Sequence, residues 1–287
     1  MADRKVDDET GVETTGHSWD GIEELNNPLP RWWLWTLYLS IIWGIGYVIA
    51  YPAWPMVSGA TQGMLGWSSR GQVAAEITAH ESQNAELVTA LLAADMMTLP
   101  DQSDLNRYAV ARGGSVFRAQ CSQCHGSGAA GAKGYPNLLD SDWLWGGAMD
   151  EIIHTVRHGV RNETDPDARW SQMPAFGDIL TRSEIAATSE YVISLSHSEF
   201  EADLAATGAP LFADNCAACH GNAALGDREI GAPNLADAIW LYGGDRAALI
   251  NTIANARFGV MPAWGPRLTE ADVRAVSAYV HALGGGE

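Results

Sequence analysis

Two short stretches of the chain carry the same pattern of cysteine and histidine. Residues 121–126 read CSQCHG, and residues 216–221 read CAACHG. The pattern C-x-x-C-H is the attachment signature of haem c. Two thiols one helical turn apart can each bond one vinyl group of a porphyrin, and the adjacent histidine can bind the iron. We therefore expect two covalently bound haem c groups, one on Cys121, Cys124 and His125 and one on Cys216, Cys219 and His220.

A single copy of this motif also allows two other interpretations. Half of a zinc site can have this spacing, but the site then needs two further Cys or His ligands. A thioredoxin-like dithiol would require a βαβ context. All four cysteines of the chain lie within the two motifs, which argues against a disulfide framework. The sequence around the motifs favours haem.

The two motifs belong to a long internal repeat. Gly113, Phe117 and Cys121 recur as Gly208, Phe212 and Cys216, each four residues apart and so on one side of a helix. Further matches pair YPNLLDSDWLWGG (135–147) with APNLADAIWLYGG (232–244), QMPAFGDILT (172–181) with VMPAWGPRLT (260–269), and SEYVISL (189–195) with SAYVHAL (277–283). A repeat of this length predicts two copies of one fold, each with its own core.

The alignment of the repeats also selects the second iron ligands. Met173 and Met261 are the methionines that recur in register, each followed by Pro-Ala-aromatic-Gly. His158 is the rival ligand in the first repeat, but Phe258 occupies the matching position in the second. Each methionine most simply serves the haem of its own repeat, although the sequence also allows an exchange between the two. Methionines 96, 97 and 149 are interpreted as core residues.

Iron held by His on one side and Met on the other has no open position for oxygen or peroxide. We therefore expect no catalytic site in this chain and predict electron transfer. The net charge of −18 also makes nucleic acid a poor partner, because phosphate binding needs clustered Lys and Arg.

One segment is apolar enough to cross a membrane. Residues 32–57 contain no charge and have Trp and Tyr at both ends, as membrane-crossing helices do. Pro52 and Pro55 mark the expected end of the regular helix. The tail before it is acidic and long, unlike the basic start of a signal peptide, so we predict an uncleaved anchor. Arg4, Lys5, Arg31 and Arg70 leave its orientation undecided.

Two further segments lie outside the motifs. Residues 71–99 are rich in Ala, Glu and Leu and end before Pro100, so we predict a helical spacer there. Residues 161–172 are a polar insertion of the first repeat with no counterpart in the second. The insertion is interpreted as a surface loop, with a docking face as the alternative.

Each repeat resembles a class I cytochrome c domain, over about 103–196 and 203–285. The resemblance implies that the Gly-x-x-x-Phe helix crosses a C-terminal helix bearing an aromatic, here Tyr191 and Tyr279. It also implies that the carbonyl groups of Pro136 and Pro233 accept a hydrogen bond from the iron-binding histidines.

The segment DGIEELNNPLPRWWLW (20–35) is similar to the entry segment of the dihaem subunit of cbb-type (C-type haem–copper) cytochrome c oxidases. The resemblance implies that the chain accepts electrons from a cytochrome c or a cytochrome bc complex. It would pass them to the monohaem subunit and the oxygen-reducing catalytic subunit. A free-standing membrane-anchored dihaem shuttle is the alternative, and a dihaem peroxidase is a second one.

The sequence thus predicts a mainly α-helical chain, with one N-terminal transmembrane helix followed by two tandem class I cytochrome c domains. The expected parts are a cytoplasmic tail (1–31), the anchor (32–57), the spacer (58–102) and two cytochrome domains (103–196 and 203–287). Because c-type haem is attached outside the bacterial cytoplasmic membrane in the family it resembles, the haem domains are expected in the periplasm.

Overall fold

The structure is a computed structural model and describes residues 5–197 and 199–286. Arg4, one of the residues weighed for orientation, lies outside that part. Contacts divide the chain into two compact units, Met1–Gln83 and Asn84–Glu287.

The N-terminal tail contains a short hairpin that the sequence analysis did not predict. Strands β1 (Thr14–Trp19) and β2 (Ile22–Leu25) pair antiparallel, with Trp19 opposite Ile22. Asp20 and Gly21 between them both have positive φ (49° and 84°). A two-residue type I′ turn needs this conformation at both positions, and Asp-Gly adopts it readily.

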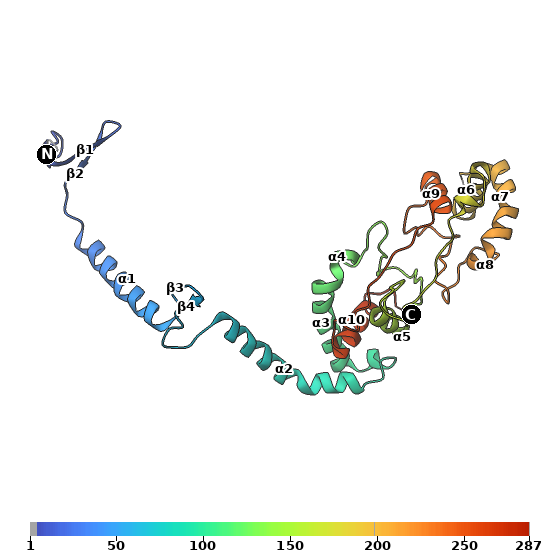
Figure 1. The fold of residues 1–287 in the computed structure, drawn as a ribbon, viewed down its shortest axis with the longest axis horizontal. Helices are drawn as coiled ribbons and strands as arrows, with labels where there is room; N and C mark the ends of the chain where they lie inside the picture. The colour runs from blue at the N-terminus through green and yellow to red at the C-terminus, as the bar shows by residue number, and fades with distance from the viewer. Residues whose placement is uncertain (1–4, 198, 287) are drawn as a thin grey trace. The chain divides into compact units, whose positions relative to one another are not determined.

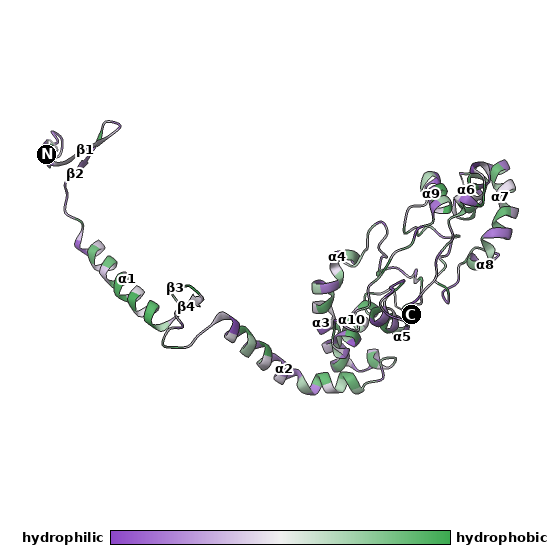
Figure 2. Ribbon diagram, viewed as in Figure 1, coloured by the Kyte–Doolittle hydropathy of each residue, from purple (hydrophilic) through white to green (hydrophobic). Residues whose placement is uncertain are grey.

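Helix α1 (Arg31–Ala50) is the apolar helix predicted for the anchor. Its most apolar stretch of 18 residues has a mean hydropathy of 1.5, and Figure 2 shows the helix green along most of its length. Twenty residues span about 30 Å, the thickness of the hydrocarbon core. It is the one helix of the described residues long and apolar enough to cross a membrane.

The regular helix is shorter than the predicted span of 32–57. It ends at Ala50, two residues before Pro52, because the ring of a proline disfavours the helical conformation of the preceding residue. The remaining residues include a small hairpin of β3 (Pro55–Met56) and β4 (Gly59–Ala60).

Helix α2 (Ser69–Ala93) corresponds to the predicted spacer, but its end has a second role. Leu91, Met96 and Leu99 are buried together with Met149 in one apolar cluster of the second unit. The segment after α2 is therefore part of a core. Met97, predicted to be a core residue, is exposed.

The second unit is helical. Its elements are α3 (Ser103–Val116), α4 (Ser122–His125), α5 (Met149–His158), α6 (Arg182–Ser196), α7 (Ala202–Asn215), α8 (Ala217–His220), α9 (Arg246–Asn255) and α10 (Glu270–His281), with 3₁₀ turns at Leu99–Asp101 and Phe176–Asp178 and a π-helical turn at Phe117–Cys121.

These helices pair across the two repeats. Helix α3 of the first repeat packs on α10 of the second, and α6 of the first packs on α7 of the second (Figure 1). At both crossings a glycine allows the backbones to touch: a Cβ on Gly113 would overlap the carbonyl of Ala275, and a Cβ on Gly208 that of Ala187.

The expectation that each repeat encloses its own core is therefore wrong. Body A is formed by residues 91–160 and 261–286, and body B by residues 173–255. The reason lies in the connection from α6 to α7, residues 197–201. A link this short makes consecutive helices antiparallel neighbours, so α6 packs on the helix that follows it. The repeat boundaries at 103–196 and 203–287 stay a prediction.

Candidate haem-binding sites

Both C-x-x-C-H motifs have the same local structure. In each, the second cysteine and the histidine lie on a single helical turn, α4 in the first repeat and α8 in the second. A glycine with positive φ ends each turn, Gly126 at 79° and Gly221 at 75°. Only a residue without a Cβ adopts this conformation easily, so the chain can turn away directly after the histidine.

Each motif histidine is held by a hydrogen bond between its Nδ1 and a proline carbonyl, as its predicted role as an iron ligand requires. Nδ1 of His125 lies 3.2 Å from the carbonyl oxygen of Pro136, and Nδ1 of His220 lies 3.0 Å from that of Pro233. These are the hydrogen bonds that the resemblance to class I cytochromes implied, and the structure confirms them. A donor proton on Nδ1 leaves the lone pair of Nε2 for a metal.

Burial favours the neutral form of both rings. It lowers the pKa of His125 and His220, and the proline carbonyls only partly oppose this. Iron binds the neutral imidazole, so both rings are in the required state near neutral pH.

The first cysteine of each motif is more enclosed than the second. Burial, helped by the neighbouring Cys124 or Cys219, raises the pKa of Cys121 and of Cys216 to about 11. Cys124 and Cys219 are exposed. The four sulfurs are therefore unpaired thiols one turn apart, which fits covalent haem attachment in both repeats.

Met261 lies in body A, beside the first motif. It contacts the apolar cluster that contains Phe117 and Ala129 and that Cys121 also joins. Two backbone hydrogen bonds, of 3.0 and 2.9 Å, join Met261 to Val160 after α5. The methionine of the second repeat is thus fixed to the helical frame of the first motif.

Met173 lies in body B, with the second motif. It packs on Phe176, Ile185 and Ile253, from the 3₁₀ turn, α6 and α9. The same two helices contribute to the core that Cys216 joins. The structure therefore groups Met173 with the second motif and Met261 with the first, the exchanged arrangement that the sequence left open.

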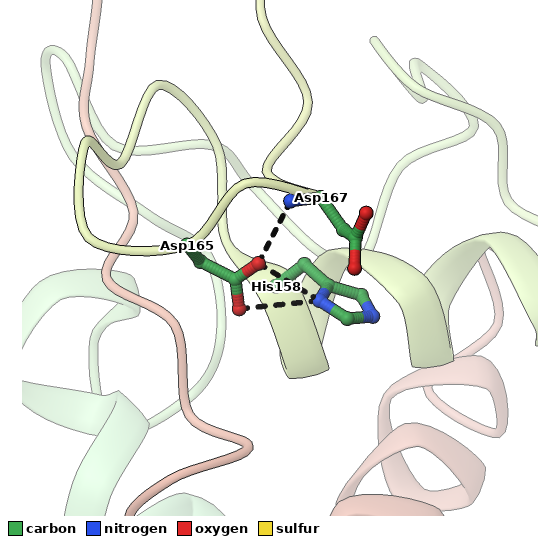
Figure 3. Close-up of side chains that lie close together, drawn as sticks. All are labelled: His158, Asp165 and Asp167. Atoms are coloured by element: carbon green, nitrogen blue, oxygen red, sulfur yellow. Dashed lines mark hydrogen bonds and ion pairs between the residues drawn. The ribbon is translucent and has the colours of Figure 1, made fainter.

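His158, the rival ligand, is engaged by the insertion (Figure 3). Its Nδ1 lies 3.2 Å from both carboxylate oxygens of Asp165, and Asp165 accepts the backbone N–H of Asp167 at 2.9 Å. The backbone carbonyl of Asp167 lies 3.1 Å from Nε2 of His154. These contacts fasten the insertion to α5.

The insertion is also one of the two crossings between the bodies. Residues 161–172 lead from body A to body B, and residues 256–260 lead back. The sequence assigned the insertion to the surface and indicated no role for its Arg161 and Arg169, which the structure places over the ring of Trp145. The sequence did contain one signal for the exchange of helices between the repeats, namely the short link between α6 and α7.

Comparison with known proteins identifies the family. A family model described as "N-terminal domain of cytochrome oxidase-cbb3, FixP" matches residues 11–58. A second, "Cytochrome C oxidase, cbb3-type, subunit III", matches residues 109–192 and again 203–280. The chain belongs to the cbb3-type cytochrome c oxidase subunit III family.

Full-length relatives agree with this assignment. The cbb3-type cytochrome c oxidase subunit CcoP of Cereibacter sphaeroides is 56% identical over 276 residues, 96% of this chain and 95% of the relative. The subunit FixP of Sinorhizobium medicae is 52% identical over 289 residues and covers all of both chains. The CcoP subunit of Rhodobacter capsulatus is 49% identical, covering 96% of this chain and 97% of the relative.

These findings confirm the predicted kinship, the mainly helical fold with two tandem cytochrome domains, and the role as an electron-transfer subunit. Subunit III of a cbb3-type oxidase is a membrane-anchored cytochrome c, so haem c is its cofactor and α1 its candidate span. The free-standing shuttle is the weaker interpretation.

Proposed function

We propose that the chain carries two haem c groups and conducts electrons through both. Cys121 and Cys124 would bind the first haem covalently, and Cys216 and Cys219 the second. The paired thiols and the neutral, carbonyl-bonded histidines support this assignment, because they recur with the same geometry in both repeats.

We infer that the axial methionines are exchanged between the repeats. The iron on the first motif would have His125 and Met261 as ligands, and the iron on the second His220 and Met173. The observation that carries this inference is the packing of each methionine with the core of the opposite motif.

Membership of the family supports a proposal for the electron path and for its location. The donor would be a cytochrome c or a cytochrome bc complex, and the acceptor the monohaem subunit, which passes electrons to the catalytic haem–copper subunit. The N-terminal tail would be cytoplasmic, and both haem bodies would lie in the periplasm of a bacterial inner membrane. Haem would supply the one-electron chemistry, and the cysteines, histidines and methionines named above would hold it.

A tagged-haem experiment tests the exchange. A haem held by one thioether keeps one vinyl group, so its absorption is shifted from that of a haem held by two. Cys219→Ala tags the second haem in this way, and Met261→Ala is then added. We expect the untagged haem to become high-spin while the tagged haem stays low-spin. Cys124→Ala with Met261→Ala is the matched control, in which the tagged haem changes.

High-spin iron in the tagged haem of the first double variant would show that Met261 serves its own repeat. A wild-type chain with fewer than two thioether-linked haems would refute the assignment as a whole. Copurification of the chain with a large polytopic haem subunit in mild detergent tests its place in the oxidase.

A further inference from the structure

Four side chains of the kinds that bind metal ions gather at the end of α5. His154 and His158 are four residues apart and so on one face of the helix, with their ring centres 4.7 Å apart. The insertion brings Asp165 and Asp167 beside His158 (Figure 3). One ligand atom each of His158, Asp165 and Asp167 lies within 4.8 Å of the other two. The group lies outside both haem motifs, and the proposed function does not use it.

The second repeat has none of these side chains. Ala254 and Phe258 stand at the positions of His154 and His158, and the insertion that carries both aspartates has no counterpart there. The helix itself recurs, because α5 and α9 each have ten residues. A role in haem binding or packing that both repeats share would not require the group. It therefore indicates a function that belongs to the first repeat alone.

His158 and Asp165 are spaced as two ligands of one ion. Nδ1 of His158 lies 3.2 Å from both carboxylate oxygens of Asp165. A charge-assisted hydrogen bond is shorter, about 2.7–2.9 Å, and a single N–H points best at one acceptor. Ligand atoms that are each about 2.1 Å from a tetrahedral zinc ion lie about 3.4 Å from one another. The observed separation is close to this value.

Hydrogen bonds from outside the group hold the ligands in place. Nε2 of His154 lies 3.1 Å from the backbone carbonyl oxygen of Asp167, and it donates because a carbonyl oxygen can only accept. Asp165 accepts the backbone N–H of Asp167 at 2.9 Å, and Pro166 between them restricts the backbone. Metal ligands are typically oriented by such bonds. The side chain of Asp167 is exposed, so an ion can enter from solvent.

The charges around the group favour a cation. The two carboxylates bring negative charge to the C-terminal end of α5, where the helix dipole is also negative. Two arginines lie near the group, but each is paired with a carboxylate at 2.6 Å: Arg157 with Glu270, and Arg169 with Glu151. Their positive charges are therefore compensated within the chain.

We propose that His158, Asp165 and Asp167 bind a divalent transition-metal ion, and that Zn²⁺ fits best. Zinc accepts imidazole nitrogen and carboxylate oxygen together, and a water completes its tetrahedron where the protein supplies three ligands. Ca²⁺ and Mg²⁺ prefer oxygen ligands alone. His154 is a positioning residue, because it holds the backbone of Asp167 and does not touch the ion. The ion fastens the insertion to α5 six residues before Met173 and so fixes this crossing between the bodies.

Counting zinc and iron together in the purified full chain tests the site. The chain is treated with EDTA, equilibrated with Zn²⁺ over a series of concentrations and separated from the free ion, and both metals are measured by mass spectrometry. We expect one zinc ion for every two haem irons at saturation. The iron count also separates the two proposals, because fewer than two irons per chain would refute the proposed function and leave the zinc count as a separate result.

Four substitutions assign the zinc to this group. His154→Gln should weaken zinc binding about 10–100-fold, the usual effect of losing a bond that orients a ligand. His158→Ala and Asp167→Asn remove ligands and should weaken it further. Asp167→Asn changes an exposed side chain and so tests the site without disturbing the fold. Glu163→Gln is the matched control, because it removes an exposed carboxylate of the same insertion outside the group, and it should leave the affinity unchanged.

Three results would overturn the proposal. Saturation below one zinc ion per two irons in the wild-type chain would show that the group does not hold the ion. Unchanged affinity in Asp167→Asn and His158→Ala would place the zinc elsewhere. An equal loss in Glu163→Gln and Asp167→Asn would show that the insertion attracts zinc only through its charge. Displacement of the zinc by Ca²⁺ or Mg²⁺ at equal concentration would overturn the choice of ion.

Discussion

Arg112 and Asp272 form an ion pair that depends on the exchange of helices. Arg112 lies on α3 of the first repeat and Asp272 on α10 of the second, with Nη2 of Arg112 2.8 Å from Oδ1 of Asp272. The repeat alignment places Glu184 at the position of Asp272 in the first repeat. If each repeat closed on itself, Arg112 would face Glu184 instead.

A double-mutant cycle measures this difference. At 2.8 Å and an effective dielectric constant near 20, two unit charges attract by about 6 kcal/mol before any desolvation cost. The side chains are 26% and 19% exposed. Exposed pairs contribute below about 1 kcal/mol, and breaking a buried pair costs about 3–5 kcal/mol. We therefore expect a coupling energy of about 1–2 kcal/mol between Arg112→Gln and Asp272→Asn.

The assay is guanidinium unfolding of the purified full chain, followed by circular dichroism in the haem Soret band. The matched cycle combines Arg112→Gln with Glu184→Gln, which keeps the capping box with Thr181. The effects of Arg112→Gln and Glu184→Gln on the free energy of unfolding should be additive, because Arg112 lies in body A and Glu184 in body B. Coupling in the Glu184 cycle and additivity in the Asp272 cycle would refute the exchange.

Two further changes test the packing and the charges of the second unit. Gly208→Ala should lower the free energy of unfolding by about 1–3 kcal/mol, because the new Cβ would overlap the carbonyl of Ala187. Gly114→Ala should be nearly neutral, because its Cβ would meet only side-chain atoms, the Tyr279 ring at 3.2 Å and Nη1 of Arg118 at 3.5 Å; equal losses in both variants would contradict this reasoning. The pKa of Asp142 is raised, mainly by burial and further by the charges of Asp237 and Asp140. The folded chain therefore binds a proton at Asp142 more tightly than the unfolded chain does. Near neutral pH, where the carboxylate is charged, this lowers the free energy of unfolding. Asp142→Asn should therefore add up to about 1 kcal/mol at pH 7 and less near pH 4, and an equal gain at both pH values would show that charge is not the cause.

Much of the candidate site could be predicted because its chemistry is local. The spacing of Cys121, Cys124 and His125 is recognisable in any fold, since both thiols and the imidazole must reach one porphyrin. The hydrogen bond from His125 to Pro136 followed from the same resemblance, and the structure contains it. The apolar helix was found from composition, and only its end, at Ala50, was placed too late.

The partners of Met173 and Met261 could not be predicted in the same way. Recurrence in register marks both residues as special but does not say which core each one joins. The same limit applied to Trp145 and Arg169, because their unpaired donors become visible only when the insertion is placed beside the Trp145 ring.

The sequence by itself determined the chemistry of this protein: two haem attachment motifs, one histidine and one methionine candidate in each repeat, and an apolar anchor. These depend on residue types a few positions apart, where covalent geometry fixes what can meet. Only the tertiary structure decided which halves of the repeats pack together. The link between α6 and α7, residues 197–201, has only five residues, and a link this short makes consecutive helices antiparallel neighbours, so that α6 packs on α7 and α3 packs on α10.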